Sequence, residues 1–344
     1  MNTVPETISQ RKIRHLEICT KPELYQIETD SSGFDQWHFA HRSMPETDWN
    51  SLNTRVDFLD WTSPAPLFIS CMTGGAIGAL SFNRELALAA AQLGLAIGTG
   101  SIRVLLHHPE YLDDFRLKQW APAVPLLANI GAVVIRDEDS TRIIELVKQI
   151  GADALVIHLN PGQELFQADG DRDFRGVRTA LAAFINTAPF PVIVKETGFG
   201  IAPDEVDFLL SAGAAYVDIA GSGGANWIRV EAYRSGNSAI APEFDHWGYR
   251  SSELLEQLSD YPGKILASGG LRNGTDCAKA LALGATLCGM ATPLARAVSL
   301  GGHEAVVEHL GNTIQSLKSI MLLTGSATIQ DLRRPGVLVK KNRC

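Results

Sequence analysis

The chain has 344 residues, of which 45% are hydrophobic, enough to build a substantial core. Its 30 Lys and Arg against 38 Asp and Glu give a net charge of -8, which argues against a broad nucleic-acid-binding surface. No segment reaches the roughly 20 apolar residues that cross a bilayer, and the first 15 residues lack the apolar core of a signal peptide. We therefore expect a cytoplasmic protein with neither a nucleic-acid nor a membrane partner.

Eight short apolar runs alternate with helical patterns from about residue 66 onward, an order typical of a parallel sheet covered by helices. The runs lie at residues 66–71, 95–100, 124–129, 154–160, 191–196, 215–221, 264–270 and 285–291. They predict an α/β fold, a (β/α)8 TIM barrel over 66–344, with an N-terminal extension over 1–65 that contributes to the substrate site. A long loop is expected at about 222–250. The alternative, an open doubly wound sheet, would normally carry a G-x-G-x-x-G motif after its first strand, and none occurs there.

A dense basic cluster, Arg11, Lys12, Arg14 and His15, lies in the N-terminal extension of this otherwise acidic chain. Short charge runs are usually solvated. The alternative is that the cluster closes over a diphosphate, which Arg103 would reach through charge-assisted hydrogen bonds.

Polar and glycine residues follow several of the predicted strands, at the barrel end where active sites are built. Thr73-Gly74-Gly75 follows the first strand, and glycine lets a flat ligand approach the backbone closely. Later in the chain, His158 and Asn160 share one face of the fourth strand. Gln163 and Glu164 come next, and Glu164 is a candidate Mg2+ ligand.

Lys195 ends an otherwise apolar run in PVIVKETGFGI. A buried ammonium needs compensation, so Lys195 is expected either to contact a ligand or to form a salt bridge with Glu196 or another carboxylate. Gly269 and Gly270 follow the seventh strand and Ala291-Thr292 the eighth, the common phosphate position of this fold, although the two glycines could simply permit a tight turn. A phosphate there and a planar group across the barrel mouth suit flavin mononucleotide (FMN), with Lys195 stabilising negative charge near N1 of the reduced ring.

Taken together, the segments RKIRH, CMTGG, GSIR, ANIGA, HLNPGQE, DGDRDFRG, VKETGFG, GSGGANW, SGGLRNG and LLTG resemble the type 2 isopentenyl diphosphate isomerases, almost from end to end. The resemblance implies an FMN-dependent barrel that interconverts isopentenyl and dimethylallyl diphosphate in isoprenoid biosynthesis. It further implies a requirement for reduced flavin and Mg2+, with NADPH as reductant, and assembly into homo-tetramers or homo-octamers.

The resemblance also assigns roles to individual positions. The expected cofactor-binding residues are Met72, Thr73, Gly74, Ser101, Asn129, Lys195, Gly269, Gly270, Arg272, Ala291 and Thr292. The expected substrate-binding residues are Arg11, Lys12, His15, Arg103, His158, Asn160 and Gln163, with Glu164 as the metal ligand. Gln163, His158 and Lys195 are the expected catalytic residues. The chain departs from the family at Ile102, where glutamine is common, and at Ala225, where threonine is common; Asn226 could supply the lost hydrogen bond near the flavin.

The chemical problem is to move a proton across an unactivated alkene without net redox change. Our hypothesis is that reduced FMN exchanges the proton through N5 and stabilises carbocation character electrostatically, while the neutral amide of Gln163 positions the substrate. Two alternatives are an FMN-dependent 2-hydroxy-acid oxidoreductase and a catalytically silent flavin-binding protein. The first would normally carry a His-Arg pair in a late loop, and residues 222–227 and 271–273 contain none.

Overall fold

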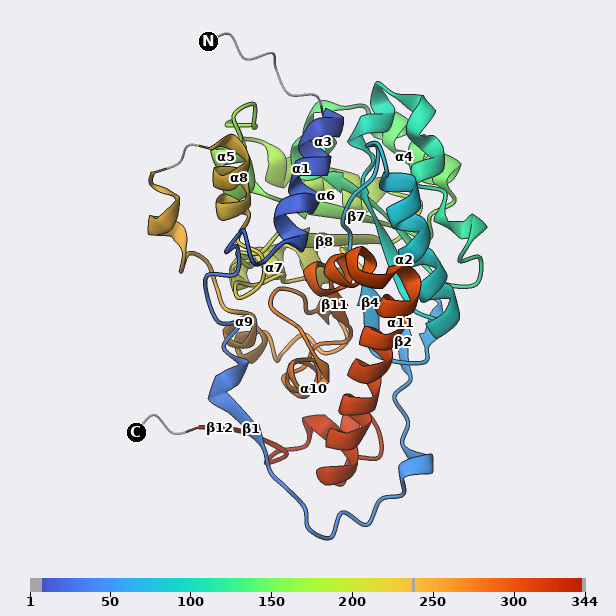
Figure 1. Cartoon of the computed structure of the whole chain (residues 1–344), viewed down its shortest axis with the longest axis vertical. Coiled ribbons are helices and arrows are strands. Elements are labelled where there is room, and N and C mark those ends of the chain that lie inside the picture. The colour runs from blue at the N-terminus through green and yellow to red at the C-terminus, as the bar shows by residue number, and fades with distance from the viewer. Residues whose placement is uncertain (1–7, 237–238, 342–344) are drawn as a thin grey trace.

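The structure is a computed structural model that describes residues 8–236 and 239–341. Its centre is a ring of eight parallel strands, ordered β10-β9-β8-β7-β6-β5-β4-β11 and closed by a bridge between Ala267 and Cys288 (Figure 1). The strands are β4 (Leu67–Ile69), β5 (Ala96–Ser101), β6 (Leu126–Gly131), β7 (Ala154–Leu159), β8 (Val192–Glu196), β9 (Tyr216–Asp218), β10 (Ile265–Leu266) and β11 (Cys288–Met290). Each overlaps one of the eight predicted runs, so the TIM-barrel prediction is confirmed.

Helices surround the ring, and most of them cover the outer faces of its strands. They are α2 (Ala79–Leu93), α3 (Ala132–Asp137), α4 (Ser140–Ile150), α5 (Pro161–Phe166), α6 (Val177–Thr187), α7 (Pro203–Ser211), α8 (Trp227–Ser235), α9 (Ser251–Gln257), α10 (Gly274–Ala282) and α11 (Thr292–Leu323). Local signals set their ends: the side chain of Asp139 caps the start of α4, and Gly151 ends that helix in a left-handed conformation. None of the helices in the described ranges has both the length and the apolar character needed to cross a membrane.

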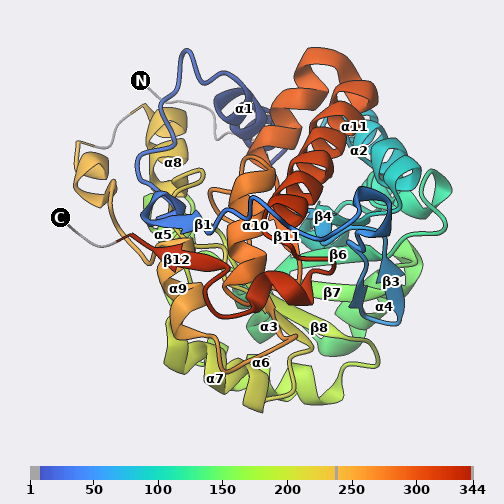
Figure 2. The same ribbon diagram turned by 90° about the horizontal axis from the view of Figure 1, so that it is seen from below.

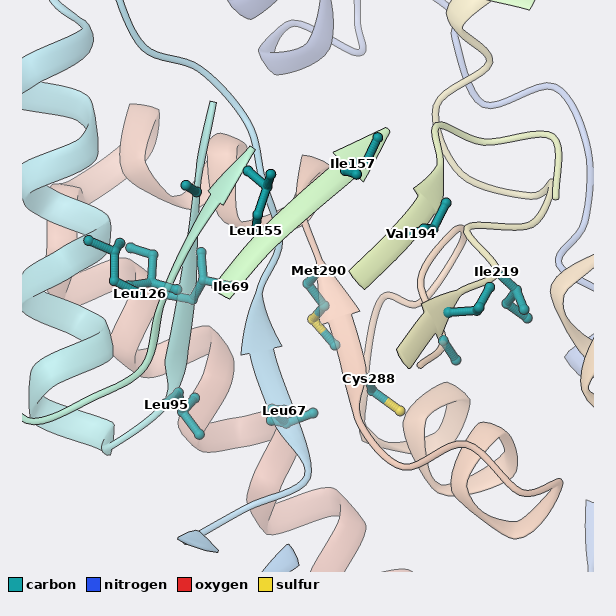
Figure 3. Packing of buried hydrophobic residues seen from close by; sticks show 14 of the residues in the cluster. Leu67, Ile69, Leu95, Leu126, Leu155, Ile157, Val194, Ile219, Cys288 and Met290 are labelled. Carbon is teal, nitrogen blue, oxygen red and sulfur yellow. The ribbon is translucent and has the colours of Figure 1, made fainter. Parts of the chain in front are cut away.

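The main core lies between the strands and these helices. Figure 3 shows apolar side chains of this layer, among them Leu126, Leu155 and Val194, on neighbouring strands of the ring. A second core fills the lower interior of the barrel with side chains of the opposite strand faces, including Phe68, Leu127 and Ile193. The two cores follow from the alternation of side chains along a strand.

A small hairpin closes the amino-terminal end of the barrel. Its strands are β2 (Val56–Phe58) and β3 (Trp61–Ser63). Phe58 is fully buried within the inner core, and the backbone N–H of Leu59 donates to the Tyr216 hydroxyl at 3.2 Å. The hairpin therefore seals the end of the barrel opposite the carboxyl ends of the strands.

The rest of the N-terminal extension lies across the outside of the barrel. Helix α1 (Ile8–Thr20) contacts α8 and α11, and strand β1 (Trp37–Phe39) pairs antiparallel with β12 (Leu338–Lys340) at the other end of the chain (Figures 1 and 2). Short 3-10 turns complete the described chain: η1 (Phe34–Gln36), η2 (Trp49–Ser51), η3 (Ile102–Leu106), η4 (Pro109–Asp114), η5 (Leu117–Gln119), η6 (Ala241–Phe244) and η7 (Gln330–Arg333).

The segment expected as a long loop at 222–250 differs from that expectation because it contains α8 and η6. The side chain of Asn226 accepts hydrogen bonds from the backbone N–H groups of Ile228 and Arg229, which begins α8, and left-handed Gly236 ends it. These are ordinary helix-capping signals. The described part of this segment is therefore a folded wall beside the barrel mouth.

Candidate active site

A large cavity opens at the carboxyl ends of the barrel strands, beneath α1. Of the predicted site residues, all except Gly74 line it: Arg11, Lys12, His15, Met72, Thr73, Ser101, Arg103, Asn129, His158, Asn160, Gln163, Glu164, Lys195, Gly269, Gly270, Arg272, Ala291 and Thr292. The carbonyl oxygen of Gly74 lies just outside and accepts a hydrogen bond from the Lys12 ammonium. The fold thus brings together residues that are up to 281 positions apart, from Arg11 on α1 to Thr292 at the start of α11.

Lys195 projects from β8 into this cavity with only 9% of its surface exposed. Its ammonium donates to the backbone carbonyl of Glu196 at 2.7 Å. The Glu196 carboxylate instead accepts backbone N–H bonds from residues 197–199, so it fixes the turn after β8. The two side chains therefore do not form the direct salt bridge that was the structural alternative for Lys195. Burial raises the pKa of Glu196 to about 7.

His158 lies beside Lys195, one strand away and in register with it. Its Nδ1 is 3.0 Å from the Asn129 side-chain oxygen, which suits an Nδ1–H donor. Burial first, and then the positive charges of Lys195, Arg103 and Lys12, lower the pKa of His158 to about 3. The imidazole is therefore neutral at physiological pH and presents a hydrogen-bonding group without adding charge.

Glu231 on α8 is a site residue that the sequence analysis missed. It is fully buried and accepts from the Gln163 amide at 3.1 Å, while His15 Nε2 lies 3.0 Å and Arg234 Nε 2.6 Å from its oxygens. Burial alone would raise its pKa, but hydrogen bonding to His15, together with Arg234, lowers the pKa of Glu231 to about 2. The carboxylate thus stays charged and fixes the orientation of Gln163. A loop over 222–250 predicts no such partner, whereas helix α8 places Glu231 one turn after Trp227.

Helix α1 presents one basic face to the cavity. Arg11 pairs with Asp169 at 3.2 Å, and the ring of His15 packs edge-on against Trp227 at a centroid distance of 5.2 Å. Lys12 is half-buried, and burial first, then the charge of Arg11, lowers its pKa to about 8. The cluster is therefore not a freely solvated tail in this structure.

Arg14 and Arg103 occupy the edges of this basic region. Arg14 faces away from the cavity, where it pairs with Glu17 and stacks over Tyr25. Arg103 reaches the cavity from η3 and lies 3.6 Å from Asp171, with about half of its side chain exposed. It is consequently available to an anion that enters between α1 and the barrel.

The opposite side of the cavity is lined by two glycine turns and the start of a helix. Gly269 and Gly270 adopt φ values of +86° and +75°, and a Cβ at Gly269 would lie 2.0 Å from the Gly221 carbonyl oxygen. These glycines therefore permit the tight turn and also leave the backbone open to a ligand in the cavity. Helix α11 begins at Thr292 beside them, and the N-terminus of a helix favours anions.

Arg272 contributes to this side differently from the expectation. Its guanidinium pairs with Glu28 and donates to the carbonyls of Gly223 and Gly270. It therefore ties the N-terminal extension to the two glycine turns. Because the Arg272 guanidinium already has these partners, it could contact a phosphate only in addition to them.

An unpaired hydroxyl group at the cavity wall also fits a bound FMN. The Thr73 hydroxyl is buried at the cavity wall without a hydrogen-bond partner in the described chain. Such a group needs a partner, and a flavin ring offers both donors and acceptors. Of the two departures, Ala225 lines the cavity and Ile102 is fully buried in the main core. Asn226 does not compensate for Ala225 here, since its side chain caps α8 and donates to Thr29 and Phe244.

Glu164 is held at the cavity edge by Asn160, whose amide donates to it at 2.9 Å, and by the backbone N–H of Asp171 at 2.9 Å. Within residues 8–236 and 239–341 no three His, Cys, Asp or Glu side chains gather as a metal site. A cation at Glu164 would therefore need ligands from substrate and solvent, which is the usual habit of Mg2+.

Comparison with known proteins gives three findings. The family profile described as FMN-dependent dehydrogenase matches residues 173–339. The isopentenyl-diphosphate delta-isomerase of Borreliella afzelii (strain PKo) is 38% identical over 331 residues, covering 96% of this chain and 93% of the relative. That of Rickettsia prowazekii (strain Madrid E) is 39% identical over 335 residues, covering 96% and 97%.

Solved structures with the same fold are more distant in sequence. A Pediococcus acidilactici protein described as a lactate oxidase matches with a TM-score of 0.69 at 16% identity, over 99% of this chain and 97% of that one. A variant of a chimeric (S)-mandelate dehydrogenase matches with a TM-score of 0.67 at 18% identity, over 96% and 98%. At these identities the likeness shows the shared barrel alone.

Proposed function

The chain belongs to the isopentenyl-diphosphate delta-isomerase family, and from this premise we propose that it interconverts isopentenyl and dimethylallyl diphosphate with FMN as cofactor. The observation that carries the proposal is the joining of two halves in one cavity. A glycine-lined cradle with Lys195 suits a flavin, and a basic helix above it suits a diphosphate.

We assign the flavin to the barrel side of the cavity. Thr73, Asn129 and Lys195 would hold its ring system, and the turns of Gly269 and Gly270 with the start of α11 would hold its phosphate. Met72, Gly74, Ser101, Arg272 and Ala291 complete this proposed set. Reduced FMN supplies an electron-rich ring that can stabilise positive charge on a neighbouring alkene and a position for proton exchange.

We assign the diphosphate to Arg11, Lys12 and Arg103, with His15, His158 and Asn160 shaping the pocket. These cations act as charge-assisted donors to phosphate oxygens. The neutral state of His158 leaves the positive charge concentrated on the basic groups of α1, η3 and β8. Binding would thus orient the substrate with its anionic end under α1.

Gln163 is the group we expect nearest the reacting double bond. Its amide is locked by Glu231 at 3.1 Å, so it presents a fixed dipole and does not titrate. The charged Glu231, buried behind it, favours positive charge in the same region. These two residues therefore position and electrostatically assist a proton transfer.

Further elements of the proposal rest on the family resemblance and on single features of the chain. We propose Mg2+ at Glu164, completed by diphosphate oxygens, and NADPH as the source of reducing equivalents. A cytoplasmic location is supported by the four described cysteines, which are all free thiols. Assembly into homo-tetramers or homo-octamers is part of the same proposal.

The test is an anaerobic assay of the purified chain with isopentenyl diphosphate, FMN, Mg2+ and dithionite. We expect dimethylallyl diphosphate to accumulate to an equilibrium ratio, with no stoichiometric consumption of reductant. Lys195→Met serves as the matched variant and should lose most of its FMN affinity along with turnover. Full reduction of FMN without isomer formation would refute the proposed function.

The 2-hydroxy-acid oxidoreductase alternative is less well supported. Residues 222–227 and 271–273 contain no His-Arg pair, and Arg272, the arginine that follows β10, is already engaged with Glu28 and backbone carbonyls. Oxidation of lactate or mandelate with reduction of bound FMN, at a rate exceeding isomerisation, would reverse this preference.

A further inference from the structure

The upper interior of the barrel is polar, although the layer beneath it is apolar. Lys195 on β8 is in register with His158 on β7 and with Asp218 on β9, so the three side chains sit on adjacent strands. Asp218 is 2% exposed and does not line the cavity, while Lys195 does. A buried cation on the wall therefore has a buried carboxylate one strand away.

Asp218 is held in place by polar contacts of its own. The Ser268 hydroxyl lies 2.8 Å from Oδ1 and 3.0 Å from Oδ2, and the backbone N–H of Ala220 donates to Oδ1 at 3.2 Å. No direct ion pair joins Asp218 to Lys195, whose ammonium donates to the Glu196 carbonyl instead. The two side chains therefore lie on adjacent strands in a poorly solvated interior, where Coulomb interactions are strong.

Asp218 is the carboxylate that faces Lys195 from the adjacent strand. Burial raises the pKa of Asp218, and the positive charge of Lys195 opposes that rise. The groups that face this pair from the neighbouring elements are Cys71 after β4, Asn129 on β6, His158 on β7, Glu196 on β8 itself and Ser268 after β10. Burial raises the pKa of the Cys71 thiol to about 11, so it is uncharged at neutral pH, and His158 is neutral as well. The Glu196 carboxylate accepts the backbone N–H groups of residues 197–199, which hold it in the turn after β8.

We propose that Asp218 is a positioning residue, the buried counter-charge that keeps Lys195 in its ammonium form before the cofactor binds. Burial in a poorly solvated interior disfavours the charged form of any amine that lacks a nearby counter-charge. With Asp218 present, the cavity offers a fixed positive group to an electron-rich ligand. The consequence for function rests on the proposed FMN role of the cavity, but the ionisation of Lys195 can be measured without FMN.

The first test is acetylation of the full-length protein with trace acetic anhydride, which reacts with neutral amines, at pH 6.5 to 9.5. Peptide mass spectrometry gives the rate at Lys195 relative to the exposed Lys21 in the same sample. In Asp218→Asn we expect this ratio to rise about tenfold or more near pH 7, because a lost opposite charge at short range changes the neutral amine population by that factor. Asp171→Asn, the same change at a carboxylate that lines the cavity, should alter the ratio less than about twofold.

The second readout is the dissociation constant of FMN across the same pH range. The FMN affinity of Asp218→Asn should fall as pH rises, whereas the affinity of the unaltered protein should not. The same substitution in a Lys195→Gln background should add no such pH dependence, because its effect passes through the lysine. If circular dichroism shows that Asp218→Asn does not fold, Asp218→Ser carries the same expectations.

An unchanged acetylation ratio in the Asp218 variant overturns the inference, as does a new pH dependence that survives in the Lys195→Gln background. Failure of the unaltered protein to bind FMN would instead refute the proposed cofactor role. The acetylation result would still decide whether Asp218 keeps Lys195 charged. The two failures are therefore distinguishable.

Discussion

The ionisation of Lys12 predicts a specific pH dependence of diphosphate binding. Burial and the neighbouring Arg11 lower the pKa of Lys12 to about 8, and the free site loses this cation as pH rises through that value. From that pKa, about 90% of the side chain is charged at pH 7 and about 10% at pH 9. A bound diphosphate holds the ammonium charged, so apparent affinity should fall about tenfold from pH 7 to pH 9, or about 1.4 kcal/mol.

The assay is calorimetric titration of isopentenyl diphosphate into the oxidised, non-turning-over protein with Mg2+ between pH 6.5 and 9.5. Lys12→Arg is the matched control, because a guanidinium keeps its charge across this range. Lys12→Gln should bind more weakly at pH 7 and show no such fall. Ionisation of the ligand itself contributes equally to all three proteins, so the difference between them isolates Lys12. A fall of equal size in Lys12→Arg would refute the reasoning.

Three further predictions concern the barrel and the cavity. Phe58→Ala should lower the free energy of unfolding by about 3–5 kcal/mol in chemical denaturation, because the ring fills the closed end of the barrel. Gly269→Ala should weaken FMN binding by at least about tenfold, since a Cβ there meets the Gly221 carbonyl oxygen at 2.0 Å, whereas Gly311→Ala meets nothing within 4 Å and should leave affinity unchanged. Glu231→Gln should expose α1 to protease at least about tenfold faster by removing the charge that holds His15, and equal cleavage rates would contradict this.

The barrel can be predicted from the sequence because each strand has local sequence signals. Runs such as 154–160 and 191–196 are apolar, β-branched and bounded by turn residues, and in a parallel barrel their ends must converge. All the predicted site residues except Gly74 consequently line one cavity, although their individual roles stay predictions.

Long-range partners account for what the sequence analysis missed. Glu231 gains its importance from His15, which is 216 positions away (231 minus 15), and Arg272 is diverted to Glu28, 244 positions away. Asp218 sits in a predicted strand, yet only the register with Lys195 shows which charge it faces. Periodicity reports which face a side chain shares and is silent about which distant segment covers that face.

The pairing of β1 with β12 has a consequence for biosynthesis. Trp37 lies opposite Lys340, so this ladder joins segments about 300 residues apart. A ribosome synthesises a chain from its N-terminus, so β1 has no pairing partner until residues 338–340 have emerged. The part of the N-terminal extension that contains β1 can therefore pair with β12 only after all eight barrel strands have been translated.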